Sequence, residues 1–456
     1  MTYAASDDAV YQLNAQDQFL FIHDYTIDIS LIFKGQLNEQ VLRTSFGELL
    51  KTDYKAFCGR LASSASKGFV LRVPRKAKEG TDFSWYSKDF TDSPLHDFLD
   101  DAHPAPGSAR LEALRDYSAI YPFKSSRRLK DFVDKEFSSI EIHCTKFKDA
   151  TAILFSISHM ICDGGGAKIL LQAWQDKVNG EPLQPVTEML DLPPVNDSVL
   201  QTVTDRVPWS TWKCFTYYLF LKWTQYWNAY PECRRFTLSG ELVERLKRSG
   251  GNASGHNSSS FSLSSAILLK LTAAGKGLRL SESISVFPAV NLRWQFKGNE
   301  TFAHNFYHLP KFTVSIADVE NESISELAIQ NKAALNKYIK DKNKLRLEWH
   351  LMGENLPAPF LPYYIDNVLN VSDWASFKFR DLDFKQAVVT HEEGAGKVLD
   401  MDCLMDFKAV LNGGVVLKND GYFGDGGIVL YITMQKLQWK RAERALGDIA
   451  RYIETL

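Results

Sequence analysis

The chain has 456 residues, a formal net charge of −2 and 45% hydrophobic residues, values that are typical of globular proteins. They exclude disordered, collagen-like and low-complexity proteins, and the balanced charge argues against a dedicated nucleic-acid binder. At about 150 residues per domain, the length predicts two to four domains. Aromatic residues make up 12% of the chain, which favours apolar pockets in addition to hydrophobic cores.

The first half of the chain mixes predicted helices and strands. In chain order, the spacing of apolar residues predicts a helix, two strands and a second helix at 37–50, 69–73, 150–158 and 167–178. Residues 180–208 contain five of the sixteen prolines, which indicates a surface linker. The aromatic stretch 209–227 that follows is interrupted by polar residues well before the ~20 apolar residues of a membrane span. We expect an amphipathic connecting helix there, with peripheral membrane contact as the alternative.

The second half repeats this mixture. A helix is expected at 238–248, followed by a flexible loop at 249–260 that is rich in Gly, Asn and Ser. Further helices are predicted at 262–274, 324–347 and 435–452, and strands at 284–290, 368–371, 402–409 and 427–433. We therefore predict an α/β protein with one domain at 1–190, a crossover linker at 191–225 and a second domain at 226–456.

Residues 1–18 are polar and acidic and lack the apolar segment of a signal peptide. The six cysteines are scattered without a C-x-x-C pair, so the sequence indicates neither a zinc site nor a disulfide framework. His304 and His308 have a spacing that suits a metal pair on a helix, but no third ligand is evident. We expect a soluble, cytoplasmic monomer that binds no metal ion.

The residues best suited to catalysis lie between the predicted strand 150–158 and the next predicted helix. His159 ends the strand, and Asp163 and three glycines open the helix. A histidine at a strand end can be held rigidly at a cleft, and its ordinary pKa of ~6.5 suits a general base. From the residues alone, His159 could equally be a buried or capping histidine, and Asp163 a helix N-cap. The glycines do not form a phosphate-binding loop, because the G-x-x-x-x-G-K-[ST] pattern is absent.

His159, Asp163 and Gly164 form an H-x-x-x-D-G motif, which resembles that of the BAHD acyltransferases. The motif is also similar to that of condensation domains, carnitine acyltransferases and chloramphenicol acetyltransferase. Further family motifs are matched in chain order: L-S-x-x-D at 13–17, A-G-R-L at 58–61, a helix tryptophan at Trp174, a Ser/Thr–Phe helix start at 258–261, V-D-x-R at 290–293, T-S-W at 371–374, D-F-G-W-G at 383–387 and the last strand from 425. The resemblance therefore covers nearly the whole chain.

Two departures from the family pattern stand out. Only Asp383 and Phe384 remain of D-F-G-W-G, and Asn291 replaces the aspartate of V-D-x-R. In the family, the D-F-G-W-G loop lies far from the catalytic histidine and shapes the donor channel. Its loss therefore puts the shape of that channel in doubt more than it does catalysis. Together the departures favour a microbial, fungal member over a plant one.

The resemblance implies two chloramphenicol-acetyltransferase-like domains, each a mixed sheet with helices, with a solvent channel at their interface. Acyl-CoA would enter from one side as co-substrate, and an acceptor alcohol or amine from the other, with no permanently bound cofactor. The abundance of aromatic residues, and not the resemblance, favours a small, apolar acceptor. His159 would be the general base, acting directly without a covalent acyl-enzyme. Asp163 would pair with Arg293 and orient the turn, in preference to a His–Asp relay.

Weaker assignments also follow from the resemblance. Ser372, with help from the backbone of Gly164, could donate to the oxyanion, or it could simply form a turn. Ser258, Ser259 and Ser260 match the position of CoA contacts, and Asp383 would support the loop near the donor channel. Cys162 is a rival nucleophile, although its place in the turn favours inward apolar packing. Two alternatives stay open: a condensation-like enzyme that uses a carrier-protein thioester, and a non-catalytic member that binds a small molecule.

Overall fold

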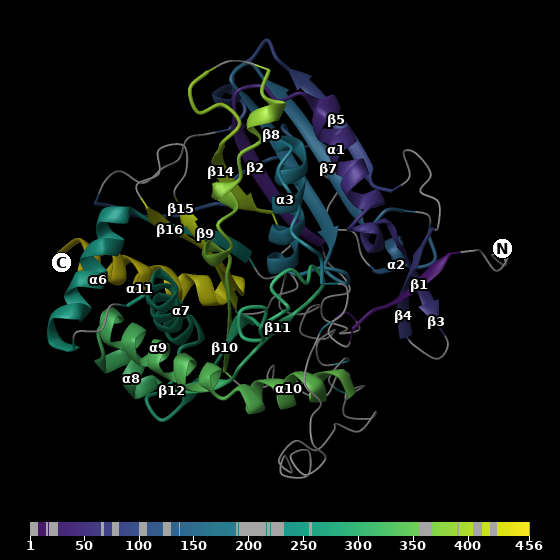
Figure 1. The fold of residues 1–456 in the computed structure, drawn as a ribbon. Coiled ribbons are helices and arrows are strands. Elements are labelled where there is room, and N and C mark those ends of the chain that lie inside the picture. The colour runs from purple at the N-terminus through teal and green to yellow at the C-terminus, as the bar shows by residue number, and fades with distance from the viewer. Residues whose placement is uncertain are drawn as a thin grey trace.

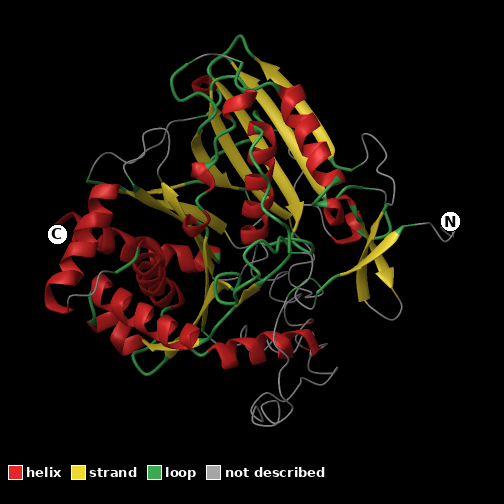
Figure 2. Cartoon of the chain, viewed as in Figure 1, coloured by secondary structure: helices red, strands yellow, loops and turns green. Residues whose placement is uncertain are grey.

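The computed structural model describes residues 8–14, 17, 26–64, 68–74, 82–99, 107–121, 129–135, 137–187, 190, 216, 219, 232–254, 258–354, 367–389, 392–404, 413–419 and 426–455. Within these ranges it shows two mixed sheets, each with helices packed on it, and a small third sheet (Figures 1 and 2). The predicted α/β class is confirmed. No helix in the described part of the chain is long and apolar enough to cross a bilayer.

The first mixed sheet carries the H-x-x-x-D-G segment. Its five strands lie in the order β14-β2-β8-β7-β5, with bounds β14 Val398–Cys403, β2 Thr26–Lys34, β8 Ala150–Ser158, β7 Ile140–Phe147 and β5 Ser84–Phe90. The helices α1 (Glu39–Lys51) and α3 (Gly164–Asn179) lie side by side on one face of this sheet (Figure 1). All nine residues of β8 are buried, because the strand is central and both of its faces are covered.

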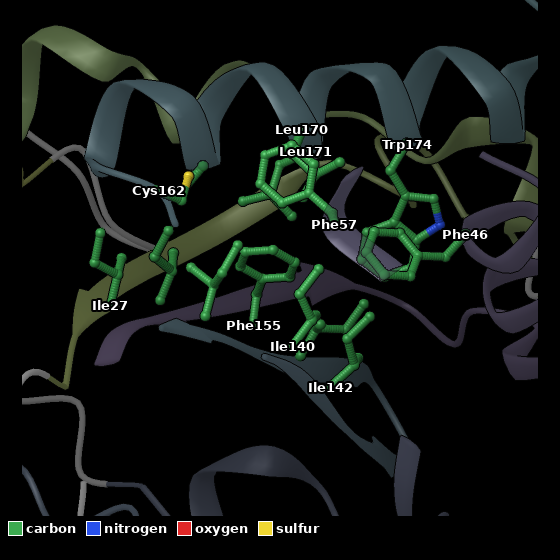
Figure 3. Close-up of a cluster of buried hydrophobic side chains, with 14 of the residues drawn as sticks. Ile27, Phe46, Phe57, Ile140, Ile142, Phe155, Cys162, Leu170, Leu171 and Trp174 are labelled. Carbon is green, nitrogen blue, oxygen red and sulfur yellow. The ribbon is translucent and has the colours of Figure 1, made fainter. Parts of the chain in front are cut away.

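Phe155 of β8 and Trp174 of α3 belong to the core between the sheet and these helices (Figure 3). Trp174 is fully buried, and its indole N–H donates to the carbonyl of Leu42 in α1 at 3.1 Å. A buried indole needs such a partner, since an unsatisfied N–H costs desolvation energy. The contact fixes α3 against α1 and so sets the direction in which the start of α3 points.

The second mixed sheet has eight strands. Seven form the path β11-β10-β13-β15-β16-β9-β6, and β12 pairs with β10. Their bounds are β6 Ala109–Glu112, β9 Glu232–Leu238, β10 Ser283–Asn291, β11 Tyr307–His308, β12 Phe312–Ser315, β13 Val368–Asp373, β15 Gly413–Asn419 and β16 Gly427–Met434. The associated helices are α6 (Gly240–Ser254), α7 (Ser260–Lys276), α8 (Ile316–Asn321), α9 (Ile324–Lys340), α10 (Lys342–Glu354) and α11 (Lys436–Thr455).

The two halves of the chain exchange strands. β6 comes from the first half but pairs with β9 in the second sheet, while β14 comes from the second half but pairs with β2 in the first. Each mixed sheet therefore contains a strand from the other half of the chain, so the domain boundaries predicted from the sequence do not separate the two sheets completely. Residues 191–215 of the predicted linker, and most of the aromatic stretch after it, lie outside the described residues.

The third sheet is small and lies beside the first, with strand order β1-β4-β3 (Figure 1). The strands are β1 Ala9–Gln12, β4 Gly68–Val73 and β3 Arg60–Ser64, and the short helices nearby are η2 (Lys55–Cys58) and α2 (Leu129–Phe132). The remaining short helices are η3 Leu95–Asp97, η5 Ala375–Phe377, η6 Phe379–Asp381 and η7 Lys385–Ala387.

Three predictions of secondary structure are wrong in detail. The single helix expected at 324–347 is two helices, because α9 ends at a C-cap, Asp341, before α10 begins. The loop expected at 249–260 is shorter, since α6 continues to Ser254 despite its glycines. Part of the strand predicted at 402–409 lies outside the described residues, and β14 starts four residues earlier, at Val398.

Candidate active site

His159 follows the last residue of β8, at the edge where the first sheet meets the second half of the chain. Its backbone carbonyl accepts a hydrogen bond from Nδ2 of Asn305 at 2.8 Å. The side chain is half-buried, and its ring centroid lies 6.2 Å from that of Tyr307. Burial lowers the pKa of His159 below its usual 6.5. The imidazole is therefore neutral at pH 7, which is the form that can accept a proton.

Asp163 serves as a helix cap and as an ion-pair partner at once. Its extended backbone precedes α3, and Oδ1 accepts from the backbone N–H of Gly166 at 2.7 Å. Oδ2 accepts from the N–H of Phe306 at 2.8 Å and from Nη1 of Arg293 at 3.1 Å. Nη2 of Arg293 lies 2.9 Å from Oδ1. The carboxylate is thus fully occupied by structural contacts and holds α3 against a loop from the second half of the chain.

Arg293 is almost fully buried, and its guanidinium donates in several directions at once. Besides Asp163, it donates to the carbonyls of Phe302, His304 and Phe306. A buried guanidinium is tolerated only when its charge is paired and its N–H groups are satisfied. Arg293 therefore ties the loop 302–306 into a tight arc around the start of α3.

Asn291 takes part in the same arrangement despite its departure from the family pattern. Its Oδ1 accepts from the backbone N–H of Arg293 at 3.1 Å and from Nη1 at 3.2 Å. An amide oxygen supplies the acceptor that a carboxylate would supply, without adding a second buried negative charge. The hydrogen bonds that orient Arg293 are therefore present with asparagine at this position.

Three glycines open α3, because other segments approach this part of the helix too closely to leave room for a side chain. A Cβ on Gly166 would lie 1.9 Å from the carbonyl oxygen of Ala303, and one on Gly164 would lie 2.5 Å from the ring of Phe377. A Cβ on Gly165 would meet Nη1 of Arg293 at 2.8 Å. The glycines thus allow close packing between the two halves of the chain.

Residues 303–306 contact the turn 159–163 and the start of α3 at almost every position, and we call this segment the clamp. Nδ1 of His304 hydrogen-bonds to the carbonyl of Ile161 at 2.8 Å, and Asn305 donates to the carbonyl of His159. The N–H of Phe306 donates to Asp163, and the carbonyl of Ala303 packs on Gly166. No motif in the sequence indicates these contacts, because they are mostly with backbone atoms more than a hundred residues away, which leave no spacing signal.

Asp17, from the motif near the start of the chain, is a hydrogen-bond partner of the clamp. Its Oδ1 accepts from Nδ2 of Asn305 at 2.7 Å, the same group that donates to His159. Oδ2 accepts from the N–H of Asn14 at 2.7 Å, and Nδ2 of Asn14 donates to the carbonyl of Asn305 at 2.9 Å. Complete burial raises the pKa of Asp17 to about 8. One amide group thus links the Asp17 carboxyl to the backbone of His159.

Ser372 lies on β13 and pairs in register with Ala289 of β10, the strand that leads into Arg293. Its Oγ accepts from the indole N–H of Trp374 at 3.1 Å, which leaves the hydroxyl proton available for donation. The segment after it reaches the first half of the chain, because Phe377 packs on Gly164 and Trp374 belongs to the core beneath α3. Ser372 therefore lies on a strand whose end meets the start of α3.

The three serines matched to CoA contacts lie at the start of α7. Ser259 caps the helix, accepting from the N–H of Ser262 at 3.1 Å, and Ser260 is the first helical residue. Ser258 is buried, and its Oγ hydrogen-bonds to none of the described residues. This end of α7 presents backbone N–H groups and a positive dipole, features that suit an anion.

Asp383 lies at the opposite end of α3 from His159. Its backbone N–H donates to Oε1 of Gln175 at 2.7 Å, and its carbonyl accepts from Asn179 at 2.8 Å. Because α3 spans 16 residues, this end is roughly 22 Å from the helix start. Asp383 anchors its loop to the last turn of α3 and is not brought together with the turn 159–163.

Cys162, His304 and His308 are buried and make contacts within the fold. Cys162 is fully buried, and burial raises the pKa of its thiol well above the usual value. His304 belongs to the clamp, while Nε2 of His308 lies 2.8 Å from Glu348. Among the described residues, no three side chains of His, Cys, Asp or Glu form a group that could hold a metal ion.

Comparison with known proteins gives a family and a fold. The model of the Transferase family matches residues 8–387. "Transcriptional regulator sdnM" of Sordaria araneosa is 24% identical over 246 residues, 50% of this chain and 49% of that protein, so the match spans about half of this relative's length. "Acetyltransferase MATC1" of Mycosarcoma maydis is 21% identical over 383 residues, 73% of this chain and 71% of the relative.

Among solved structures, F. sporotrichioides TRI101 complexed with coenzyme A and T-2 superposes with a TM-score of 0.66 at 13% identity. The match covers 96% of this chain and 97% of TRI101, so the two proteins share the whole fold. These three similar proteins come from fungi, as the motif departures predict for this chain. Because the family model covers well over half of the sequence, the chain belongs to the Transferase family, and the family membership predicted from its BAHD-like motifs is confirmed.

Proposed function

We propose that this protein transfers an acyl group from acyl-CoA to the hydroxyl or amine of a small, apolar specialised metabolite, with His159 as the general base. The observation that carries the proposal is the support of His159: Asn305 holds its carbonyl, and burial keeps its imidazole neutral. Support also comes from the fold shared with TRI101, which was solved with coenzyme A, and from a relative named as an acetyltransferase.

In the proposed reaction, a ring nitrogen of His159 removes the proton of the acceptor O–H or N–H while that atom attacks the thioester carbonyl. The new C–O or C–N bond forms, the C–S bond breaks, and the imidazolium returns the proton to the CoA thiolate. No covalent acyl-enzyme is needed, because the thioester is already activated. Acyl-CoA is thus a co-substrate and not a resident cofactor.

The other site residues have supporting roles in this proposal. Asp163 and Arg293 orient the turn, since every contact of the carboxylate is structural. The hydroxyl of Ser372 stabilises the oxyanion, together with backbone N–H groups near Gly164. The start of α7, with Ser258, Ser259 and Ser260, receives a phosphate or the pantetheine arm of CoA. A solvent channel at the domain interface brings the two substrates to His159 from opposite sides.

The test is a panel of acyl-CoAs and candidate acceptors, read by release of free CoA thiol, with wild-type protein, His159→Ala and His96→Ala. His96 is a matched control because its side chain is 68% exposed. We expect His159→Ala to lose about 10²–10⁴-fold in rate and His96→Ala to keep the wild-type rate. Equal rates for wild-type protein and His159→Ala would overturn the proposal.

A donor carried by a protein would be detected in the same assay. If no free acyl-CoA supports turnover but an acylated carrier protein does, the protein acts as a condensation-like enzyme. A protein that turns over neither donor but binds the acceptor would be a non-catalytic member of the family.

A further inference from the structure

A cavity of about 450 Å³ lies beside the clamp, between the small third sheet, η2 and the segment that follows α3. Aromatic and aliphatic side chains form much of its lining, among them Tyr11, Tyr54, Phe57, Val73, Val186 and His304. The volume is within the range of ~300–1,000 Å³ that is usual for small-molecule sites. None of the described lining residues belongs to the turn 159–163. The cavity is therefore separate from the catalytic histidine and shares only the clamp with it.

The inner wall of the cavity is an aromatic stack. The ring of His304 lies between Phe57, at a centroid distance of 4.7 Å and an angle of 5°, and Tyr11, at 4.8 Å and 25°. The charged residues that line the cavity, Asp53 and Lys55, are exposed. Aromatic walls with charge only at the entrance favour a neutral, largely apolar ligand, since a charged one would lose its hydration without a buried partner.

His304 adds a ring nitrogen to the hydroxyl groups of Tyr11, Tyr54 and Thr187 among the polar groups of the lining residues. Nδ1 must donate in its contact with Ile161, because a carbonyl oxygen only accepts. In the neutral ring Nε2 then carries the lone pair, and it hydrogen-bonds to none of the described residues. Burial lowers the pKa of His304 to about 4, so the ring stays neutral at pH 7. Because His304 lines the cavity, this nitrogen is the acceptor that we assign to a donor group of a bound ligand.

We propose that this cavity is a second small-molecule site, which binds a neutral, mostly apolar compound through one hydroxyl group that donates to Nε2 of His304. The site requires neither acyl-CoA nor the chemistry of His159, so it goes beyond the proposed function. Its occupant would contact His304, and His304 hydrogen-bonds to the carbonyl of Ile161 in the turn 159–163.

The test uses 2-naphthol, a flat aromatic compound with one hydroxyl donor, titrated into the protein without acyl-CoA and followed by calorimetry. Ala56 lines the cavity on η2, so Ala56→Trp fills it, whereas Leu280→Trp adds the same bulk at a position that is 62% exposed. We expect saturable binding to wild-type protein and Leu280→Trp, and binding weaker by at least about tenfold in Ala56→Trp. Undiminished binding to Ala56→Trp, or no saturable binding to wild-type protein, would overturn the proposal.

The hydroxyl contact has its own comparison. 2-Methoxynaphthalene has the same ring system without a donor, and we expect it to bind wild-type protein about fivefold more weakly than 2-naphthol. Equal affinities would exclude Nε2 of His304 as the acceptor. Circular dichroism melting verifies that each variant is folded. If Ala56→Trp does not fold, Val186→Trp fills the cavity from a different segment and the same outcomes apply.

Discussion

Arg293 and Asp163 form a two-pronged ion pair across the two halves of the chain, with contacts of 2.9 and 3.1 Å between buried groups. One partner lies in the loop after β10 and the other caps α3, so the pair joins the two mixed sheets at the turn 159–163. The clamp completes this junction by contacting His159, Ile161 and Asp163. The position of the proposed base is therefore set by residues more than a hundred positions away in the sequence.

The first prediction concerns Asp163→Asn. The amide can still cap α3, but it removes the charge that compensates the buried guanidinium of Arg293. Breaking such a pair on one side costs about 3–5 kcal/mol, so we expect lower soluble yield and a lower urea midpoint as well as a lower rate. Urea unfolding followed by circular dichroism measures the loss. A variant with wild-type stability and a lost rate would instead favour a His–Asp relay.

Asp448→Asn is the matched control for this experiment. Asp448 pairs with Arg451 on α11, but both side chains are largely exposed, at 70% and 77%. Exposed pairs contribute little to stability. The urea midpoint of Asp448→Asn should therefore equal that of the wild-type protein, which separates the effect of the buried pair from a general effect of removing an acidic side chain.

The second prediction concerns Gly166→Ala. The added Cβ would lie 1.9 Å from the carbonyl oxygen of Ala303, a backbone atom that cannot rotate away. We expect the clamp to separate from the turn, with a stability loss of about 1–3 kcal/mol or more and a fall in rate. Gly447→Ala is the control, because nothing lies within 4 Å of its added Cβ on α11. That change should stabilise the protein by about 0.5–1 kcal/mol.

A comparison of Tm values for these two variants measures the difference directly. Opposite signs are expected for the same chemical change, destabilising at Gly166 and stabilising at Gly447. If Gly166→Ala melts at or above the wild-type temperature, the close approach between α3 and the clamp does not constrain the fold.

The sequence predicted much of this arrangement, and the failures have physical causes. His159, Asp163 and Gly164 are adjacent in the chain, so a local motif contains them, and Arg293 follows from a second motif. The clamp contacts the turn mainly through backbone carbonyls and N–H groups, which any sequence possesses. Asn305 and His304 were therefore not recognised as supports of the turn. The break at Asp341 was missed because apolar spacing is similar in α9 and α10, while the cap that ends α9 is a single residue.

The third prediction is the pH dependence of the rate. The proposed base acts only when neutral, and burial lowers the pKa of His159 below 6.5. The rate under subsaturating substrates should therefore be flat near pH 7 and fall only at more acidic pH, below the ordinary titration range of histidine. A profile that falls with a midpoint above 6.5 would contradict the neutral, desolvated state of His159.

The fourth prediction is a pH dependence of stability that arises from His304. Its pKa is about 4 in the folded protein and 6.5 for an exposed histidine, so between these values the unfolded chain binds the extra proton. The contribution of His304 to stability is therefore complete above pH 6.5 and is lost as pH falls toward 4. His304→Asn keeps an amide N–H for Ile161 but does not titrate. Asp17, with its raised pKa of about 8, makes a pH-dependent contribution of opposite sign that is present in both proteins. The stability of the wild-type protein relative to His304→Asn, from urea unfolding at the same pH, should therefore fall between pH 7 and 4.5, and a constant difference would exclude His304 as the source.

The last prediction concerns Asp383, the first residue of the reduced D-F-G-W-G segment. Its backbone, and not its side chain, makes the hydrogen bonds to Gln175 and Asn179, and the segment docks on the end of α3 that is distant from His159. Asp383→Ala should therefore leave the rate of acyl transfer within about twofold of wild type, because no group near the turn changes. Gln175→Ala, which removes the acceptor of the Asp383 N–H, should lower stability by about 1–3 kcal/mol. Steady-state rates and urea midpoints for both variants test this division. A large loss of rate in Asp383→Ala at unchanged stability would give this carboxylate a direct part in binding the donor.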